Sequence, residues 1–297
     1  MSFPLPRPVG EGSRLAVVAP AGPFDREAFQ KGVAWLERRY EIVHGTGIFT
    51  KTGYFAGSDE RRLGELMDAI ADPAVDAILC ARGGYGATRL LPRIDLEPIR
   101  RANKTIVGFS DVTALHAAWV RAGVRSVHAP MVASLGKAEQ SSLGKRWIDA
   151  LEHPDERRGW SLERLDAGDS ESGEGILFGG NLAVLGALLG TPFVPPLDDA
   201  ILFVEDVGER PYRVDRMLTT MNQAGWFRRI RGLVLGAFTG GNPGEDGVRV
   251  EDVLEQQFGE AGIPVLRGLS AGHVEDNDPL PFGAPARISE NRLEVNF

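Results

Sequence analysis

Three side chains in this sequence have the chemical types that nucleophilic catalysis requires. Ser110 follows the apolar run 105–109, Glu205 follows the apolar run 200–204, and His273 lies in the glycine-flanked turn 270–275. A serine can serve as a nucleophile, a histidine can take its proton near neutral pH, and a carboxylate can hold the histidine in the required tautomer. Together the three residues indicate acyl transfer more strongly than any one of them does alone.

Ser110 lies where a predicted strand passes into a predicted helix. The stretch 104–123, KTIVGFSDVTALHAAWVRAG, is typical of a buried strand, a tight turn and a helix. A serine in this turn faces the positive end of the helix, where backbone N–H groups can stabilise an oxyanion. Alternatively, Ser110 or Asp111 serves only as the helix cap.

A glycine-rich turn, RGGYG at 82–86, follows the predicted strand 75–81. Its bare backbone lets N–H groups approach a ligand closely. We expect the amide of Gly84 to supply one oxyanion donor and the amide of Asp111 the other, although a simple tight turn explains the glycines equally well. The spacing matches neither GxGxxG nor a P-loop, so a nucleotide site is disfavoured.

The carboxylate and the histidine have competitors in the sequence. Glu205 is the acid nearest its strand, whereas Asp206 or Glu209 could cap the next helix or pair with Arg210 and Arg213. His273 is the histidine that lies in a glycine-flanked turn of the second half; the others are His44, His116, His128 and His153. HExxH is absent and Cys80 is the single cysteine, so we expect no metal site and no internal disulfide.

The elements that must position these residues indicate an α/β fold. In the first half, apolar strands alternate with amphipathic helices, which is typical of a parallel sheet covered on both faces. Ligands bind beyond the carboxyl ends of such strands, where the candidate turns lie. The polar, acidic stretch 141–174 predicts a linker, so we expect an N-terminal domain at 1–140 and a C-terminal domain at 175–297.

Composition limits the partners of this 297-residue chain. Its formal charge of −8 argues against a nucleic-acid partner, whose phosphates favour a basic face. No stretch approaches the about 18 apolar residues of a spanning helix, and the N-terminus lacks a signal-peptide core. These features predict a cytoplasmic protein that binds neither nucleic acid nor membrane.

The order Ser110, Glu205, His273 is the order of α/β-hydrolase triads. The nucleophile stretch, GFSDV at 108–112, nevertheless lacks the glycine that closes the G-x-S-x-G elbow. That fold is therefore disfavoured.

Several long motifs occur together, in order, along nearly the whole chain: AVVAPAGP, LMDAIADPAVDAILCARGGYGATRLL, GFSDVTALH, HAPM, GGNL, VEDVGERPYRVDRML, and the GH at His273 followed by LPFG. With these the sequence resembles the LD-carboxypeptidase family of serine peptidases, which includes murein tetrapeptide carboxypeptidases and microcin C self-immunity peptidases. The resemblance implies that Ser110 is the nucleophile, that Glu205 and His273 complete the triad, and that the amides of Gly84 and Asp111 form the oxyanion hole.

The resemblance also implies a fold and an assembly. The expected fold is a flavodoxin-like or Rossmann-like N-terminal domain, related to class I glutamine amidotransferases, joined to a smaller α/β C-terminal domain. Ser110 would come from the first domain, Glu205 and His273 from the second, and the protein would be a homodimer.

The implied reaction is removal of the terminal D-alanine from a cytoplasmic murein tetrapeptide during peptidoglycan recycling, without a metal or organic cofactor. We expect Arg82 to bind the free carboxylate of this small peptide, since guanidinium pairs bidentately with carboxylates. The acidic run VEDNDP after His273 departs from the family pattern and indicates either a preference for a cationic group or a solvated turn. The alternatives are a microcin C immunity-type peptidase acting on aminoacyl or peptidyl nucleotide conjugates, and an inactive binding module of the same fold.

Overall fold

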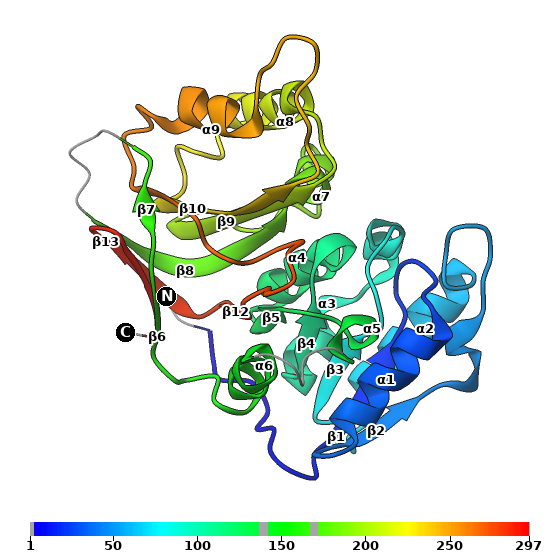
Figure 1. Cartoon of the computed structure of the whole chain (residues 1–297). Helices are drawn as coiled ribbons and strands as arrows, with labels where there is room; N and C mark the ends of the chain where they lie inside the picture. Colours follow the sequence, from blue (N-terminus) through cyan, green and yellow to red (C-terminus); the bar gives the residue numbers. More distant parts are fainter. Residues whose placement is uncertain (1–2, 137–141, 167–171, 297) are drawn as a thin grey trace. The chain divides into compact units, whose positions relative to one another are not determined.

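The computed structural model describes residues 3–136, 142–166 and 172–296, which form two compact units (Figure 1). We call residues 3–154 with 279–281 the serine unit, because they include Ser110. Residues 155–278 with 282–296 form the histidine unit, which includes Glu205 and His273. Both units are mixed α/β structures, and each is built on its own sheet.

The serine unit is built on a sheet of six strands in the order β12-β5-β4-β3-β1-β2, in which β1 to β5 pair in parallel. Its central strands are apolar and almost fully buried, as the sequence predicted for a sheet covered on both faces. The strands are β1 (Arg14–Val18), β2 (Glu41–His44), β3 (Ala77–Cys80), β4 (Thr105–Gly108), β5 (Ser126–His128) and β12 (Leu280–Phe282).

The helices of the serine unit follow these strands along the chain. Helix α1 packs against α5, and α3 packs against both α2 and α4. The helices are α1 (Arg26–Leu36), α2 (Asp59–Ala71), α3 (Leu96–Ala102), α4 (Thr113–Ala122), α5 (Val132–Leu135) and α6 (Leu143–Glu152). The turns at the carboxyl ends of β1, β3 and β4 therefore lie at one edge of the sheet, where the candidate residues were expected.

The histidine unit contains an eight-stranded mixed sheet in the order β6-β14-β13-β8-β9-β10-β11-β7. Four central strands are parallel: β8 (Ser172–Asn181), β9 (Ala200–Val207), β10 (Gly232–Thr239) and β11 (Val265–Arg267). The outer strands pair antiparallel and are β6 (Arg158–Ser161), β7 (Glu163–Arg164), β13 (Pro285–Ser289) and β14 (Arg292–Val295). The helices are α7 (Leu182–Leu188), α8 (Pro211–Gln223) and α9 (Val250–Phe258).

The stretch 141–174 differs from the linker that its composition predicted. Helix α6 buries Leu143, Trp147 and Leu151, which recur every four residues and so share one face. The Trp147 indole donates a hydrogen bond to the Pro130 carbonyl at 3.0 Å. Strands β6 and β7 follow, and the two units meet in sequence between residues 154 and 155. Residues 141 and 167–171 of the expected linker lie outside the described part of the chain.

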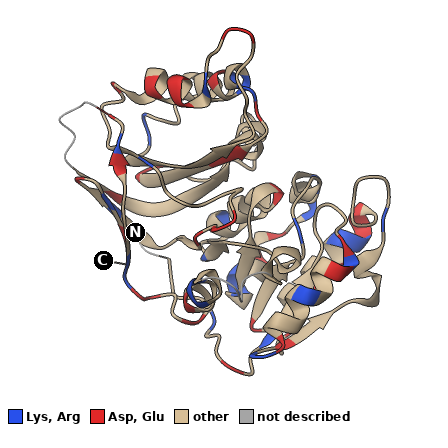
Figure 2. Ribbon diagram, viewed as in Figure 1, with Lys and Arg blue, Asp and Glu red and all other residues tan. Residues whose placement is uncertain are grey.

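Charged residues of both signs lie on the outer helices of the units (Figure 2). Cys80 is buried in β3, and burial raises the pKa of its thiol. Among the helices of the described residues, none has the length and the apolar character needed to cross a bilayer.

Candidate active site

Ser110 has an unusual backbone conformation at the end of β4. Its φ is +62°, in the left-handed region that non-glycine residues rarely adopt and that often marks functional sites. A short 3-10 helix, η4 (Ser110–Val112), leads from Ser110 into α4. The N-cap of α4 is Val112, so the chain turns sharply at Ser110 before the helix begins.

The glycine turn after β3 lies directly against Ser110. A Cβ atom at Gly83 would come within 3.0 Å of Ser110 Cβ and 3.2 Å of its Oγ, so only glycine fits there without a shift. Gly84 and Gly86 have φ values of +109° and +131°, which side chains disfavour. The Gly83 carbonyl also accepts a hydrogen bond from the Gly22 amide at 2.9 Å. The structure thus places the glycine turn next to Ser110.

The side chain of Asp111 holds this turn. The residue is 3% exposed, and its carboxylate accepts a hydrogen bond from the Ala87 amide at 2.8 Å. Burial raises the pKa of Asp111 to about 6, against hydrogen bonds from the turn and the positive charge of Arg62. The sequence predicted an oxyanion role for the Asp111 amide or a capping role for its side chain, and it gave no sign of this role of the carboxylate.

His116 forms a hydrogen bond with the last residue of strand β4, Gly108. Its Nε2 donates to the Gly108 carbonyl at 2.8 Å, and its Nδ1 accepts from the Ser126 hydroxyl at 2.8 Å. Burial lowers the pKa of His116 to about 4, so the ring is neutral near pH 7. This histidine is a structural residue that fixes the strand before Ser110.

Glu205 and His273 form a hydrogen-bonded pair in the histidine unit. His273 Nδ1 lies 2.7 Å from Glu205 Oε2, and because an ionised carboxylate can only accept, the proton lies on Nδ1. The Glu205 side chain is fully buried, whereas the His273 side chain is 20% exposed. A neutral ring with its proton on Nδ1 has its lone pair on Nε2, which is the arrangement of a general base.

Three contacts fix the turn that carries His273. Gly272 has a φ of +114°, and a Cβ atom there would come within 2.6 Å of Glu205 Oε2. Asn277 is buried, and its Oδ1 accepts a hydrogen bond from the Gly272 amide at 2.8 Å. Thr239 Oγ1 donates a hydrogen bond to the His273 carbonyl at 3.2 Å. Asn277 and Thr239 carry no sequence signal, because their roles depend on how the turn folds.

Asp206 lies beside the pair but holds the backbone instead. Its carboxylate accepts the Ala183 amide at 2.8 Å and the Val207 amide at 2.6 Å. Burial raises the pKa of Asp206 to about 6, against these hydrogen bonds. Asn181, which is paired with Glu205 in the sheet register, caps α7 by accepting the Val184 amide at 3.1 Å. Glu209 forms an ion pair with Arg213 at 3.5 Å, one of the two roles other than catalysis that the sequence left open for it.

The acidic run after His273 is held by its own hydrogen bonds. Ser270 Oγ donates to the Asp276 carbonyl at 2.7 Å, and the Asp278 amide donates to the Ser270 carbonyl at 2.7 Å. The Asp278 carboxylate accepts from the Trp160 indole at 3.0 Å. Glu275 and Asp276 are exposed, so this run forms a folded turn with two solvated acidic side chains.

Arg82, the expected carboxylate-binding residue, is exposed at the start of the glycine turn. Its Nη1 donates to the Pro23 carbonyl at 2.6 Å, which fixes the side chain between the turns that follow β1 and β3. The guanidinium has five N–H donors, so this one bond does not exhaust its capacity.

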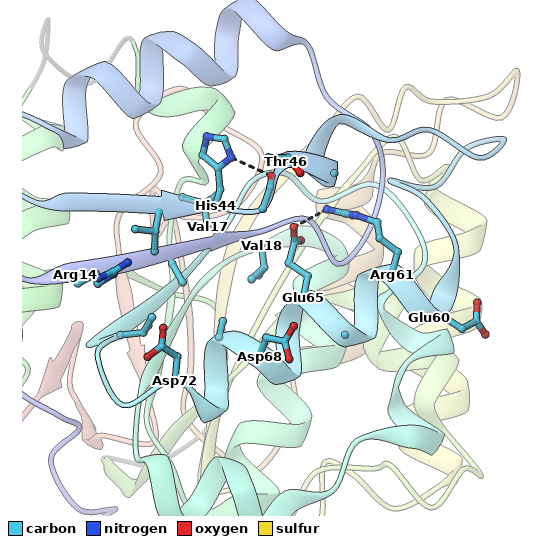
Figure 3. Close-up of a pocket in the computed structure, with 17 residues that line it drawn as sticks. Arg14, Val17, Val18, His44, Thr46, Glu60, Arg61, Glu65, Asp68 and Asp72 are labelled. Atoms are coloured by element: carbon cyan, nitrogen blue, oxygen red, sulfur yellow. Dashed lines mark hydrogen bonds and ion pairs between the residues drawn. The ribbon is translucent and has the colours of Figure 1, made fainter.

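A separate pocket of about 620 Å³ lies elsewhere on the serine unit, between β1, β2 and α2 (Figure 3). Glu65 and Arg61 pair at 2.6 Å on its wall, and Glu65 Oε2 also accepts the Ala19 amide at 2.6 Å. Neither Ser110 nor the glycine turn lines this pocket. Across residues 3–136, 142–166 and 172–296, no group of three or more His, Cys, Asp or Glu side chains could hold a metal ion.

The chain is similar in sequence to known proteins along nearly its whole length. Family models of the LD-carboxypeptidase N-terminal and C-terminal domains match residues 15–129 and 174–288. The "Probable murein peptide carboxypeptidase" of Bacillus subtilis is 33% identical, over 96% of this chain and 91% of its own. The murein tetrapeptide carboxypeptidase of Pseudomonas aeruginosa is 31% identical, over 94% of each chain.

Solved structures extend the comparison to the fold. The muramoyltetrapeptide carboxypeptidase from Oxalobacter formigenes superposes with a TM-score of 0.85 at 31% identity, covering 95% of this chain and 98% of its own. MccF in complex with glutamyl sulfamoyl guanosine shares the fold, with a TM-score of 0.86 at 22% identity over 98% of each chain. Because both domain models match in order and relatives above 30% identity align along nearly the whole length, this chain belongs to the LD-carboxypeptidase family of serine peptidases.

Proposed function

We propose that this protein is a serine-type LD-carboxypeptidase that removes the terminal D-alanine from a murein tetrapeptide during peptidoglycan recycling in the cytoplasm. The bond cut would join the L-centre of the diamino acid to D-Ala. The names of the B. subtilis and P. aeruginosa relatives support this substrate class. The observation that carries the proposal is the 2.7 Å hydrogen bond between His273 Nδ1 and Glu205 Oε2, because a hydrolytic triad needs a carboxylate that fixes the tautomer of its histidine.

In the proposed mechanism, Ser110 Oγ attacks the scissile carbonyl while His273 Nε2 takes its proton. Glu205 stabilises the resulting imidazolium, and the amides of Gly84 and Asp111 donate to the oxyanion. The amine of D-Ala leaves with the proton from His273. Water then attacks the acyl-enzyme with His273 as base, which releases the shortened peptide and restores Ser110.

The first experiment compares the wild type with Ser110→Ala on a purified murein tetrapeptide, with D-Ala release followed by mass spectrometry. We expect release by the wild type and a loss of at least about 1,000-fold in the variant, because the acyl-enzyme cannot form. Equal release by both proteins would contradict the serine mechanism. No release by either would contradict the murein substrate.

Arg82 is the proposed contact for the free carboxylate of the peptide. Its exposure and its place beside the oxyanion turn support this role. Arg82→Ala should raise KM for the peptide acid about 10-fold or more and leave KM for the peptide amide nearly unchanged, because only the acid offers a carboxylate. Equal KM values for wild type and variant on both peptides would contradict this contact.

A microcin C immunity-type activity is the second candidate. This chain shares its fold with MccF, whose structure was solved in complex with glutamyl sulfamoyl guanosine, and this likeness supports a test of the activity. Hydrolysis of an aminoacyl sulfamoyl nucleoside, with the murein peptide left intact, would select this activity. A protein that binds either compound and cleaves neither would be the inactive binding module.

We propose in addition a fold type for the serine unit and an assembly. The strand order β2-β1-β3-β4-β5 supports a flavodoxin-like N-terminal domain that carries Ser110. We also propose a homodimer. Light scattering coupled to gel filtration tests this, and a mass near the 32.1 kDa of one chain would contradict it.

A further inference from the structure

Arg62 is a fully buried arginine on α2 that the mechanism above does not use. Its exposed fraction is 0%, and it is among the largest side chains of the structure that are completely buried. Removing a guanidinium from water is costly unless hydrogen bonds and a counter-ion replace its hydration. The contacts of Arg62 therefore indicate what the buried charge holds in place.

The guanidinium of Arg62 joins three segments of the serine unit. Its Nη1 donates to the carbonyl of Pro20, in the loop after β1, and its Nη2 donates to Asp59 Oδ1 at the start of α2. The guanidinium also lies over the ring of Phe55, 4.8 Å from its centroid, in a cation–π contact. These contacts connect the loop after β1 and the loop before α2 to the helix itself.

The same guanidinium lies against the glycine turn. A Cβ atom at Gly86 would come within 2.6 Å of Arg62 Nη1, so the turn closes directly onto the charged group. Asp59, the counter-ion of Arg62, also accepts from Arg89, with Nε at 2.9 Å and Nη2 at 2.7 Å. Arg89 lies in the short helix η2 (Ala87–Arg89) that continues from the turn. The Arg62–Asp59–Arg89 cluster thus holds the turn from its far side.

The near side of the turn is held by the segment of Ser110. Asp111 accepts the Ala87 amide, and the positive charge of Arg62 favours the ionised form of this carboxylate against the effect of burial on its pKa. The backbone of Gly83 lies against the Ser110 side chain. The turn is therefore fixed between Arg62 on one side and the Ser110–Asp111 segment on the other.

We propose that Arg62 is a positioning residue that fixes the turn of Gly83 to Gly86 against Ser110 and so orients the Gly84 amide toward the oxyanion. This inference rests on the proposed function, in which Ser110 is the nucleophile and Gly84 an oxyanion donor. Oxyanion hydrogen bonds are stronger in the transition state than in the substrate complex. Loss of the arginine should therefore lower kcat and leave KM nearly unchanged.

The test uses Arg62→Met, which keeps a long side chain and removes the donors and the charge. Two rates are measured: D-Ala release from the tetrapeptide, and covalent labelling of the active serine by a fluorophosphonate, which forms a tetrahedral adduct without needing the correct peptide. We expect kcat and the labelling rate to fall about 10- to 100-fold, somewhat less than for loss of an oxyanion donor itself, with KM within about 3-fold of wild type. The matched control is Arg93→Met, which removes an exposed ion pair with Glu60 and should change neither rate.

A folded Arg62→Met protein that is labelled at the wild-type rate would overturn the proposal, as would a raised KM with unchanged kcat. If Arg62→Met does not fold, Arg62→Lys is used, because lysine keeps the charge but lacks the planar fork that reaches Pro20 and Asp59 together. A lowered labelling rate in folded Arg62→Lys supports the role, and a wild-type rate overturns it. Labelling of Ser110→Ala at the wild-type rate would instead overturn the nucleophile assignment on which this inference rests.

Discussion

The segment of Ser110 and the segment of Glu205 have the same local design. Ser110 lies just after the buried parallel strand β4, and Glu205 lies near the carboxyl end of the buried parallel strand β9. Each of these candidate residues is followed directly by a buried aspartate, Asp111 or Asp206. Each aspartate accepts a backbone amide from a neighbouring segment, and burial raises the pKa of each to about 6. In both units a carboxylate therefore ties the strand end to the structure around it.

The two segments differ in the charge that acts on the aspartate. The positive charge of Arg62 favours the ionised form of Asp111, whereas the charge of Glu205 opposes ionisation of Asp206. A positive charge near the nucleophile also suits a developing oxyanion, and a negative charge near the histidine suits a developing imidazolium. The buried aspartates thus lie in opposite electrostatic surroundings. In each segment the neighbouring charge is opposite in sign to the charge that the proposed reaction creates there.

Breaking the histidine side of this comparison should have the largest effect. Glu205→Gln replaces an acceptor with an amide that can turn its NH₂ group toward His273 Nδ1 and so favour the wrong tautomer. We expect kcat for D-Ala release to fall about 1,000- to 10,000-fold with little change in KM. Glu209→Gln, which removes only the ion pair with Arg213, is the control. A fall of less than about 10-fold in Glu205→Gln would mean that this carboxylate does not orient the histidine.

A steric change on the serine side should have the next largest effect. Gly83→Ala would place a Cβ atom 3.0 Å from Ser110 Cβ and 3.2 Å from its Oγ, so either the turn or the nucleophile must shift. We expect kcat to fall about 100-fold, the scale that loss of one oxyanion donor has. Gly64→Ala on α2, where nothing lies within 4 Å of the new Cβ, should leave kcat unchanged. Wild-type kcat in Gly83→Ala would show that the turn does not constrain Ser110.

Much of this arrangement could be predicted from residue types and their order. The apolar strands of the serine unit were recognisable because both faces of the sheet are covered, and membership of the family was predicted from its motifs and is confirmed. Helix α6 was missed because its overall polarity hides three apolar residues spaced four apart. The average composition of residues 141–174 is polar, whereas the spacing of these three apolar residues indicates a helix.

The supporting residues of the site were harder to predict. Arg62 shares one helical face with the buried Leu66 and Ile70, at i, i+4 and i+8, and a charged residue at such a position is a usable sign of a buried cation. Asn277 and Thr239 offer no such pattern, because their partners are backbone groups of a turn whose path the sequence does not specify. Polar groups that serve distant backbone atoms can be assigned only once the fold is known.

The two buried aspartates predict a pH dependence of stability. Because the pKa of each is about 6 in the folded protein and near 4 in the unfolded chain, the folded state binds more protons between these values, and stability falls as pH rises from about 4 to about 6. Asp111→Asn and Asp206→Asn each remove this loss while keeping an acceptor oxygen. As the pH rises from 4 to 7, the free energy of unfolding of each variant should therefore increase by about 1 to 3 kcal/mol relative to that of the wild type.

Denaturant unfolding of the three proteins at several pH values measures this effect. Arg62→Met removes the positive charge that lowers the pKa of Asp111, so it should raise this pKa further. The free energy of unfolding should then fall more steeply with pH, and Asp111→Asn should remove this fall. Arg62→Met should not alter the effect of Asp206→Asn on the pH dependence of stability. A difference between variant and wild type that is constant with pH would show that neither carboxylate titrates in this range.

The smallest expected effect comes from Thr239→Val. The threonine hydroxyl donates to the His273 carbonyl at 3.2 Å, and valine keeps the shape while removing this bond. We expect a loss of about 1 kcal/mol in the free energy of unfolding and a fall of less than about 5-fold in kcat, because Glu205 still orients the ring. Thr220→Val, which removes a hydroxyl bond to the Arg216 carbonyl within α8, is the matched control for stability and should not change kcat. If the two variants have equal kcat, the position of His273 depends on the Glu205 carboxylate and on the Gly272 turn rather than on Thr239.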